Sequence, residues 1–96
     1  MSAYVIIRIK VTDAEKLKEY QKVVPSIIEQ YEGRILARGS ELVSLEGPQE
    51  TRRVVMIEFP DLTREKDFYC SEVYTSAIAL RENAAVFESI AIDGLS

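Results

Sequence analysis

The chain has 96 residues, with 12 lysines and arginines against 16 aspartates and glutamates, so its formal net charge is −4. This length suits one domain over residues 1–96, because two domains would each lack an adequate core. The composition is 47% hydrophobic, which is too apolar for intrinsic disorder, and no apolar run is long enough to cross a membrane. The acidic balance argues against a nucleic-acid partner, which selects a basic surface.

The cysteine and histidine content limits the chemistry. The sequence has one cysteine, Cys70, and no histidine. A lone cysteine forms no intrachain disulfide, which is typical of a reducing compartment, so we expect a cytoplasmic protein. Without histidine the chain lacks the usual zinc or haem ligand and the usual general base near neutral pH. No glycine-rich phosphate-binding motif is present. We therefore expect no metal and no cofactor.

The first third of the chain has the pattern of a strand followed by a helix. Residues 3–11 alternate between two faces, and Thr12 to Glu15 fits a capping box that starts a helix. Pro25 predicts a kink or a division of that helix, and Gly33 suits the left-handed residue that ends it. The helix carries one apolar stripe, spaced by three or four residues, which we assign to the core: Leu17, Tyr20, Val23, Val24, Ile27, Ile28 and Tyr31.

The middle of the chain has the pattern of two strands joined by a loop. Residues 34–45 alternate imperfectly around Gly39-Ser40, which predicts a strand with a bulge or bend at that point. Residues 46–50 are turn formers, and residues 52–59 form a β-branched strand closed by Pro60.

The last third predicts a broken helix and a final strand. Residues 62–70 and 71–85 have helical patterns, with Thr63 and Ser71 as candidate N-caps. We expect the break near Ser71, because Ser-Glu can start a second helical segment there. Residues 88–93 then form a short strand.

The resulting order, β-α-β-β-α-β, predicts an α+β protein with the ferredoxin-like arrangement, a four-stranded antiparallel sheet with both helices on one face. On the helix-covered face we expect an apolar set: Val5, Ile7, Ile9, Val55, Ile57, Phe59, Ile90 and Ile92. On the opposite face we expect a mixed set: Tyr4, Ile6, Arg8, Lys10, Leu36, Arg38, Val54, Met56, Glu58 and Ala91.

The aliphatic side chains in that second set indicate a partner. An exposed cluster of this size marks an interface or a binding groove. We therefore predict a homodimer in which two sheets face each other and enclose a partly polar cavity. A monomer with an open sheet is the alternative.

Several motifs resemble the domain of unknown function 1330 family over nearly the whole chain. They are Tyr31-Glu32-Gly33-Arg34, Arg38-Gly39, Leu45-Glu46-Gly47, Arg53 through Pro60, Phe68 through Tyr74, Leu80-Arg81 and Ile92-Asp93-Gly94. The resemblance implies a dimeric α+β barrel, a superfamily that also contains cofactor-independent monooxygenases and small binding proteins. It implies no particular reaction. The chain departs from the family at Glu72-Val73, where a Pro-Glu pair is expected, and at Cys70, where small polar residues are usual.

Two charged residues on neighbouring strands form the first candidate site. Arg8 and Glu58 fit an anion clamp with a nearby carboxylate as base; a structural ion pair across the sheet is the alternative. Arg38 and Arg53 could likewise bind a carboxylate or phenolate through their guanidinium forks, or lie solvated at strand ends. Strict alternation places Arg52 on the face of Glu58, whereas the family resemblance favours Arg53, and both assignments stay open.

A second candidate site surrounds the expected helix break. Tyr69, Ser71 and Tyr74 cluster there, where a helix start with a free hydroxyl makes a small anion site. The tyrosines could instead pack their rings in the core while their hydroxyls reach water. Arg81, on the last helix, either reaches back toward this cluster or is an ordinary exposed helix arginine.

Three functions are compatible with these residues. The first is binding of a small aromatic or carboxylate-bearing metabolite in the dimer cavity, with arginines orienting the ligand. The second is a cofactor-independent enzyme, monooxygenase- or isomerase-like, acting on an activated carbon acid. There an arginine stabilises an enolate-like anion while Glu58 moves the proton, which requires a raised pKa. The third is a structural or regulatory dimer without a ligand, whose cavity is filled by side chains.

Overall fold

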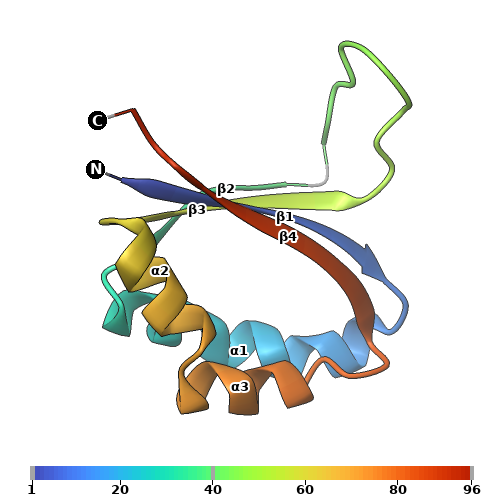
Figure 1. The fold of residues 1–96 in the computed structure, drawn as a ribbon. Coiled ribbons are helices and arrows are strands. Elements are labelled where there is room, and N and C mark those ends of the chain that lie inside the picture. Colours follow the sequence, from blue (N-terminus) through green and yellow to red (C-terminus); the bar gives the residue numbers. More distant parts are fainter. Residues whose placement is uncertain (1, 40, 96) are drawn as a thin grey trace.

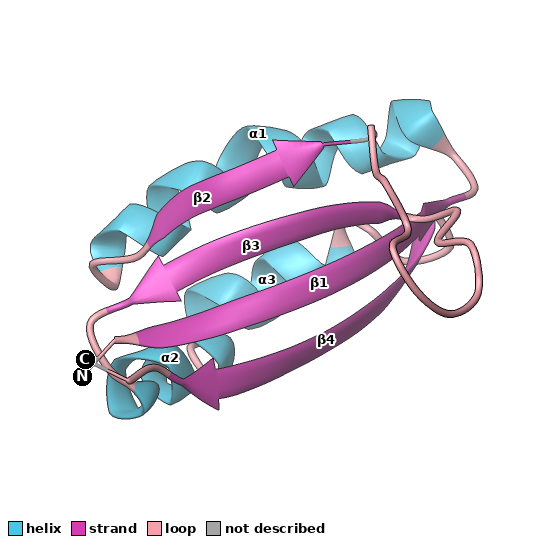
Figure 2. Ribbon diagram, turned by 90° about the horizontal axis from the view of Figure 1, so that it is seen from above, coloured by secondary structure: helices cyan, strands magenta, loops and turns pink. Residues whose placement is uncertain are grey.

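The computed structural model describes residues 2–39 and 41–95 and has the predicted α+β ferredoxin-like architecture. Its elements are β1 (Ala3–Val11), α1 (Ala14–Gln30), β2 (Arg34–Gly39), β3 (Arg53–Phe59), α2 (Leu62–Tyr69), α3 (Glu72–Ala79) and β4 (Ala85–Asp93). The strands form one antiparallel sheet in the order β2-β3-β1-β4. All three helices lie on one face, and the β2–β3 loop rises on the other (Figure 1). Figure 2 shows the strand order from above.

Helix α1 begins one residue later than the capping box predicts. Its N-cap is Asp13, whose side chain accepts a hydrogen bond from the Lys16 amide at 3.1 Å. The amides of Thr12 and Asp13 both donate to the Ala84 carbonyl, which ties the helix start to the turn before β4. Pro25 lies inside the helix without dividing it, so the predicted division is wrong.

At the end of α1, glycine is required at position 33 for a reason other than the predicted left-handed conformation. The left-handed residue is Glu32, with φ 63°, and Gly33 has no positive φ. A Cβ at Gly33 would lie 2.6 Å from Phe59 Cε1 and 2.8 Å from Ile28 Cγ2. Glycine is therefore required by the close approach of the chain to two core side chains, and not by its backbone angles.

The second helical region is broken at Ser71 as predicted. The Ser71 side chain caps α3 by accepting from the Tyr74 amide, whereas α2 is capped by Asp61 and not by Thr63. Helix α3 ends at Ala79, six residues earlier than expected, because the chain turns through left-handed Asn83 and enters β4 at Ala85.

The register confirms the predicted faces of β1 and β3 but corrects that of β4. Ile90 pairs with Ile6 and Ile92 pairs with Tyr4, so both isoleucines lie on the open face, where they are 62% and 52% exposed. Ala91 pairs with Val5 and lies on the helix side. Hydrophobicity alone misassigned this edge strand, since its larger aliphatic side chains point away from the helices.

Strand β2 also differs from the prediction. It ends at Gly39, and Ser40 lies outside the described residues. The bulge falls between Ile35 and Ala37, so the parity of the strand changes there and Leu36 is exposed. Arg38 consequently pairs with Val55 and lies on the helix side of the sheet, not on the open face.

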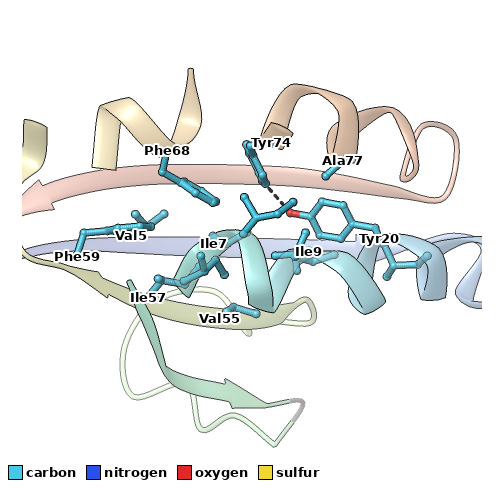
Figure 3. Packing of buried hydrophobic residues seen from close by; sticks show 14 of the residues in the cluster. Val5, Ile7, Ile9, Tyr20, Val55, Ile57, Phe59, Phe68, Tyr74 and Ala77 are labelled. Atoms are coloured by element: carbon cyan, nitrogen blue, oxygen red, sulfur yellow. Dashed lines mark hydrogen bonds between the residues drawn. The ribbon is translucent and has the colours of Figure 1, made fainter. Parts of the chain in front are cut away.

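The core fills the space between the sheet and the helices. Phe59 and Ile28 are its largest fully buried side chains, and Phe68 packs against both Phe59 and Tyr74, at ring-centroid distances of 5.1 and 4.3 Å. Figure 3 shows the hydrogen bond between Tyr20 of α1 and Tyr74 of α3 at one side of this packing. The aromatic rings thus join all three helices to the sheet.

Candidate functional site

A cavity of about 790 Å³ opens between the sheet and the helices. Its floor consists of three rows of residues that pair across the strands: Arg53–Ile9–Phe87, Arg38–Val55–Ile7–Ser89 and Ile35–Ile57–Val5–Ala91. The centre of each row is a buried aliphatic, and the polar side chains lie toward the edges of the sheet. The cavity is therefore apolar in the middle and polar at its two sides.

Small side chains on β4 create part of this space. Ser89 and Ala91 face the helices, where β1 carries Ile7 and Val5 in the same rows. Both residues are exposed although they lie on the helix-covered side of the sheet. The helices supply the roof, which includes Tyr20 and Val24 of α1, Phe68 of α2 and Tyr74 of α3.

Three arginines line the cavity, and none of them forms an ion pair with a described residue. Arg38 and Arg53 lie on adjacent strands at the β2–β3 side. Arg81 lies at the β4 side, in the turn after α3, with its guanidinium carbon 3.7 Å from the Phe87 ring centroid. Since Arg53 and Phe87 both pair with Ile9, the two sides are separated by two strand spacings, roughly 10 Å.

Tyr20 and Tyr74 place a hydroxyl pair beside Arg81. Their oxygens are 2.7 Å apart and both rings are buried. Burial raises the pKa of Tyr20 well above its ordinary value, the neighbouring Tyr74 raises it further, and the charge of Arg81 opposes this. The Tyr20 hydroxyl therefore stays protonated at neutral pH and keeps its capacity to donate a hydrogen bond.

Glu65 of α2 is the one buried carboxylate among the described cavity residues, with 7% of its surface exposed. Burial raises the pKa of its carboxyl, and the charge of Lys66 only partly opposes this. Within residues 2–39 and 41–95, no ion pair or side-chain hydrogen bond reaches this carboxylate. The raised pKa makes this carboxylate a stronger proton acceptor than an ordinary surface glutamate.

We predict that Glu65→Gln stabilises the protein at neutral pH by about 1 kcal/mol, because a neutral amide costs less to desolvate than a carboxylate. Because the folded-state pKa is raised above 4.5, the folded protein binds this proton more tightly than the unfolded chain does. The wild type therefore loses stability as the pH rises from about 4.5 through the folded pKa. Urea unfolding at pH 7 and at pH 4 checks this, and an equal difference at both values would contradict it.

The open face of the sheet holds two other predicted site residues, Arg8 and Glu58, and each already forms an ion pair. Arg8 pairs in register with Val54 and Tyr4 with Glu58, so the predicted Arg8–Glu58 contact does not form. Instead Arg34 Nε donates to Glu58 at 2.7 Å, which lowers the pKa of Glu58. A general base here requires a raised pKa, and the pKa of Glu58 is lowered instead.

Arg8 lies in a second hollow, of about 650 Å³, between the open face and the β2–β3 loop. There Glu50 lies 3.3 Å from Arg8 and accepts from Arg52, which also contacts Glu88. The hydrogen bond from Arg52 lowers the pKa of Glu50 to about 2. Arg52 thus lies with the open-face charges and Arg53 with the helix-side cavity, which resolves the two assignments that the sequence left open.

The helix-break residues divide between structural roles and the cavity. Ser71 Oγ donates to the Phe68 carbonyl and accepts from the Tyr74 amide, so its hydroxyl is occupied within the break. Tyr69 and Tyr74 line the cavity, Tyr69 half-exposed and Tyr74 buried. Cys70 is exposed at the end of α2.

Five of the eight predicted ligand residues line the helix-side cavity: Arg38, Arg53, Tyr69, Tyr74 and Arg81. Sequence reasoning missed Tyr20 and Glu65. Tyr20 was assigned to the core because it falls on the apolar stripe of α1. Glu65 could have been found as a charge three residues before Phe68, on the buried side of a helix.

Two further properties bear on function. Within the described part of the chain, no helix is both long and apolar enough to cross a membrane. Among the same residues, no three or more metal-ligating side chains gather into a cluster.

The architecture defines a ferredoxin-like α+β protein with a cavity under its sheet. The chain belongs to the family described as domain of unknown function (DUF1330), whose model matches residues 2–95. This family assignment confirms the resemblance found in the sequence. No protein of curated function matches the sequence.

Solved structures show the same fold at low sequence identity. A protein of unknown function from Rhodopseudomonas palustris, RPA0582, is 20% identical with a TM-score of 0.78, over 99% of this chain and 83% of its own. A dimeric ferredoxin-like protein of unknown function from Jannaschia sp. CCS1 is 7% identical with a TM-score of 0.75, over 98% of this chain and 100% of its own. SnoaB, a cofactor-independent oxygenase from Streptomyces nogalater, is 10% identical with a TM-score of 0.61, over 99% and 94%.

Proposed function

We propose that the protein binds a small organic anion with an apolar body in the cavity between the sheet and the helices. The observation that carries this proposal is the combination of aliphatic walls with three arginines that have no acidic partner among the described residues. An apolar pocket with a few convergent polar groups is the usual form of a small-molecule site. The net charge of the whole chain is −4, so the three cavity arginines contrast with an acidic chain.

The contrast with the open-face hollow supports this location. There Arg8 and Arg52 are compensated by Glu50 and Glu88, so an incoming anion would compete with carboxylates already in place. In the helix-side cavity an anion meets uncompensated guanidinium groups. The ligand site proposed here is thus within one protomer, whereas the sequence placed it between two sheets.

The test uses two fluorescent probes, N-phenyl-1-naphthylamine and its sulfonated analogue 8-anilinonaphthalene-1-sulfonate. We expect both to bind, with the sulfonate favoured at low salt because ionic screening weakens its contact with the arginines. Ser89→Phe, which fills the space at β4, is expected to weaken both at least tenfold. Ile92→Phe, on the open face of the same strand and outside the cavity lining, is the matched control and leaves them unchanged. Equal effects of the two variants contradict the proposal.

A second candidate function, a cofactor-independent enzyme, is favoured by Glu65. Its buried carboxylate is placed to take a proton from an acidic C–H of the bound molecule, while an arginine stabilises the anion left behind. SnoaB, an oxygenase without a cofactor, shares the fold. Native mass spectrometry of gently purified wild type and Glu65→Gln distinguishes the functions. A different small-molecule mass retained on the variant supports catalysis, and the same mass on both supports binding alone.

We further propose that two copies pair through the open faces of their sheets. The helices cover one face only, and the other exposes Val86, Ile90 and Ile92 of β4. Relatives of the same fold are dimeric, including those from Jannaschia sp. CCS1 and Bacteroides fragilis. A cytoplasmic location remains an expectation from the cysteine content alone.

A further inference from the structure

We propose that the ligand is a carboxylic acid whose carboxylate binds at the β4 side of the cavity, between Arg81 and the hydroxyl pair of Tyr20 and Tyr74. This inference rests on the proposed function and specifies the anionic group and the end of the cavity that takes it.

Hydrogen-bond counting identifies the first unpaired donor. Tyr20 and Tyr74 carry two O–H groups but share one hydrogen bond, in which either oxygen donates to the other. Arg81 also makes a side-chain hydrogen bond to Tyr20, but a guanidinium only donates, so this contact uses the Tyr20 oxygen and leaves the O–H count unchanged. Among residues 2–39 and 41–95, neither hydroxyl has a further side-chain acceptor. Both rings are more than nine-tenths buried. One O–H donor of the pair is therefore left without a protein acceptor in a sheltered position, which is costly unless a ligand supplies one.

Arg81 supplies the second unpaired donor. Its Nε is shielded from solvent and has no hydrogen-bond partner. The guanidinium lies 3.7 Å from the Phe87 ring centroid and 5.3 Å from that of Tyr20. These cation–π contacts hold the group in place but leave its Nε–H without an acceptor. The spare tyrosine O–H and the Arg81 Nε–H thus lie beside the Tyr20 ring, and each lacks a protein acceptor.

A carboxylate fits this pair of donors. It is planar, it has two oxygens, and it accepts from a guanidinium and from a hydroxyl at the same time. Among the described lining residues, Arg81 is the one fixed positive charge at the β4 side, which favours a monoanion there over a doubly charged phosphate. The apolar body of the acid would then extend from Phe87 along the aliphatic rows that contain Ile9 and Ile7.

The arginines on the other side are less suited to this role. Arg38 is exposed and Arg53 is half-buried, so water can solvate both. No buried hydroxyl pair accompanies them among the described lining residues. They contribute general attraction for an anion, whereas Arg81 has a sheltered Nε–H without a protein acceptor and lies beside the Tyr20 ring.

The experiment compares 2-naphthoate with 2-naphthamide, a neutral probe of the same shape, as competitors of N-phenyl-1-naphthylamine. Arg81→Met is expected to weaken naphthoate about 10- to 100-fold, the range for a hydrogen-bonded charge, and naphthamide no more than threefold. Tyr20→Phe/Tyr74→Phe is expected to weaken naphthoate about tenfold. The double variant is used because it leaves no single hydroxyl unpaired.

Two further variants make the result decisive. Arg53→Met removes a cavity arginine at the other side, which supplies only general attraction, and is expected to weaken naphthoate at least threefold less than Arg81→Met does. Arg81→Lys keeps the charge without the guanidinium fork and is expected to recover only part of the affinity. Bound naphthamide shows that each variant is folded.

The outcomes separate the two proposals. The first case is that both competitors bind wild type. If Arg81→Met then leaves the ratio of their affinities unchanged, or if Arg53→Met changes that ratio as much as Arg81→Met does, the carboxylate subsite is wrong and the proposed function stands. If the cavity binds none of the three compounds, the proposed function fails and this inference fails with it.

Discussion

Phe59→Ala is expected to lower the free energy of unfolding by about 3–5 kcal/mol, the range for deleting a buried aromatic side chain. Phe59 is fully buried and packs against Phe68, which in turn contacts Tyr74 and Tyr31. A chain of 96 residues has a total stability of roughly 5–14 kcal/mol, so this one change removes a large fraction of it. Urea unfolding at a fixed protein concentration measures the loss, since dimerisation would make stability depend on concentration.

Gly33 provides an independent check of the same contact. A Cβ there meets Phe59 and Ile28 within 3 Å, so Gly33→Ala is expected to cost about 1–3 kcal/mol through overpacking. In a Phe59→Ala background one of the two obstacles is gone, and the cost of Gly33→Ala should fall. Gly39→Ala is the matched control, because its added Cβ has no neighbour closer than 3.9 Å. Additive effects of the Gly33 and Phe59 substitutions would show that this packing is not as described.

The inward-facing residues of a strand could be predicted from the sequence only where polar and apolar residues alternate regularly. In β1 and β3 the pleat assigns every second residue to the core, and Val5, Ile7, Ile57 and Phe59 are buried as expected. In β2 one bulge reverses the parity beyond Ile35, and no residue between Arg34 and Gly39 marks the bulge in advance. A bulge is fixed by the pairing of two strands, so a single strand read alone does not reveal it.

The errors in β4 have a related cause. Ile90 and Ile92 were placed inward because they are the largest aliphatics of the strand. The register places Ser89 and Ala91 inward instead. Small residues on the covered face of an edge strand are what leaves space for a cavity. The sequence rule that seeks the largest apolar residues for the core therefore fails at the strand that borders the candidate site.

The candidate site was predicted by residue type more successfully than by place. Guanidinium groups are natural ligands for carboxylates, and the arginines Arg38, Arg53 and Arg81 do line one cavity. Their convergence depends on the β2 bulge and on the early end of α3, neither of which is encoded in local spacing. Glu58 and Arg8 were chosen by the same chemistry, yet each has a different partner on the open face, Arg34 and Glu50 respectively.

The corrected orientation of β4 increases the apolar surface on the open face. Ile90 lies opposite Ile6 there, and Val86 and Ile92 occupy the same face of the strand. If two sheets pair across this surface, these side chains leave water, and burial of aliphatic surface drives association. Among the charges on this face, Arg8, Glu50 and Arg52 are already paired with one another. Apolar contact can therefore form without leaving those charges unpaired.

Ile90→Glu is accordingly expected to convert the proposed dimer to a monomer, raising its dissociation constant at least 100-fold. Burying an unpaired carboxylate against a partner sheet carries a desolvation cost of several kcal/mol. Sedimentation at micromolar concentration should give twice the chain mass of 10.9 kDa for wild type and 10.9 kDa for the variant. Val73→Glu, on the helix layer and 40% exposed, makes the same chemical change away from the open face and should remain dimeric. A monomeric wild type, or dissociation by both variants alike, would rule out pairing through the open sheet face.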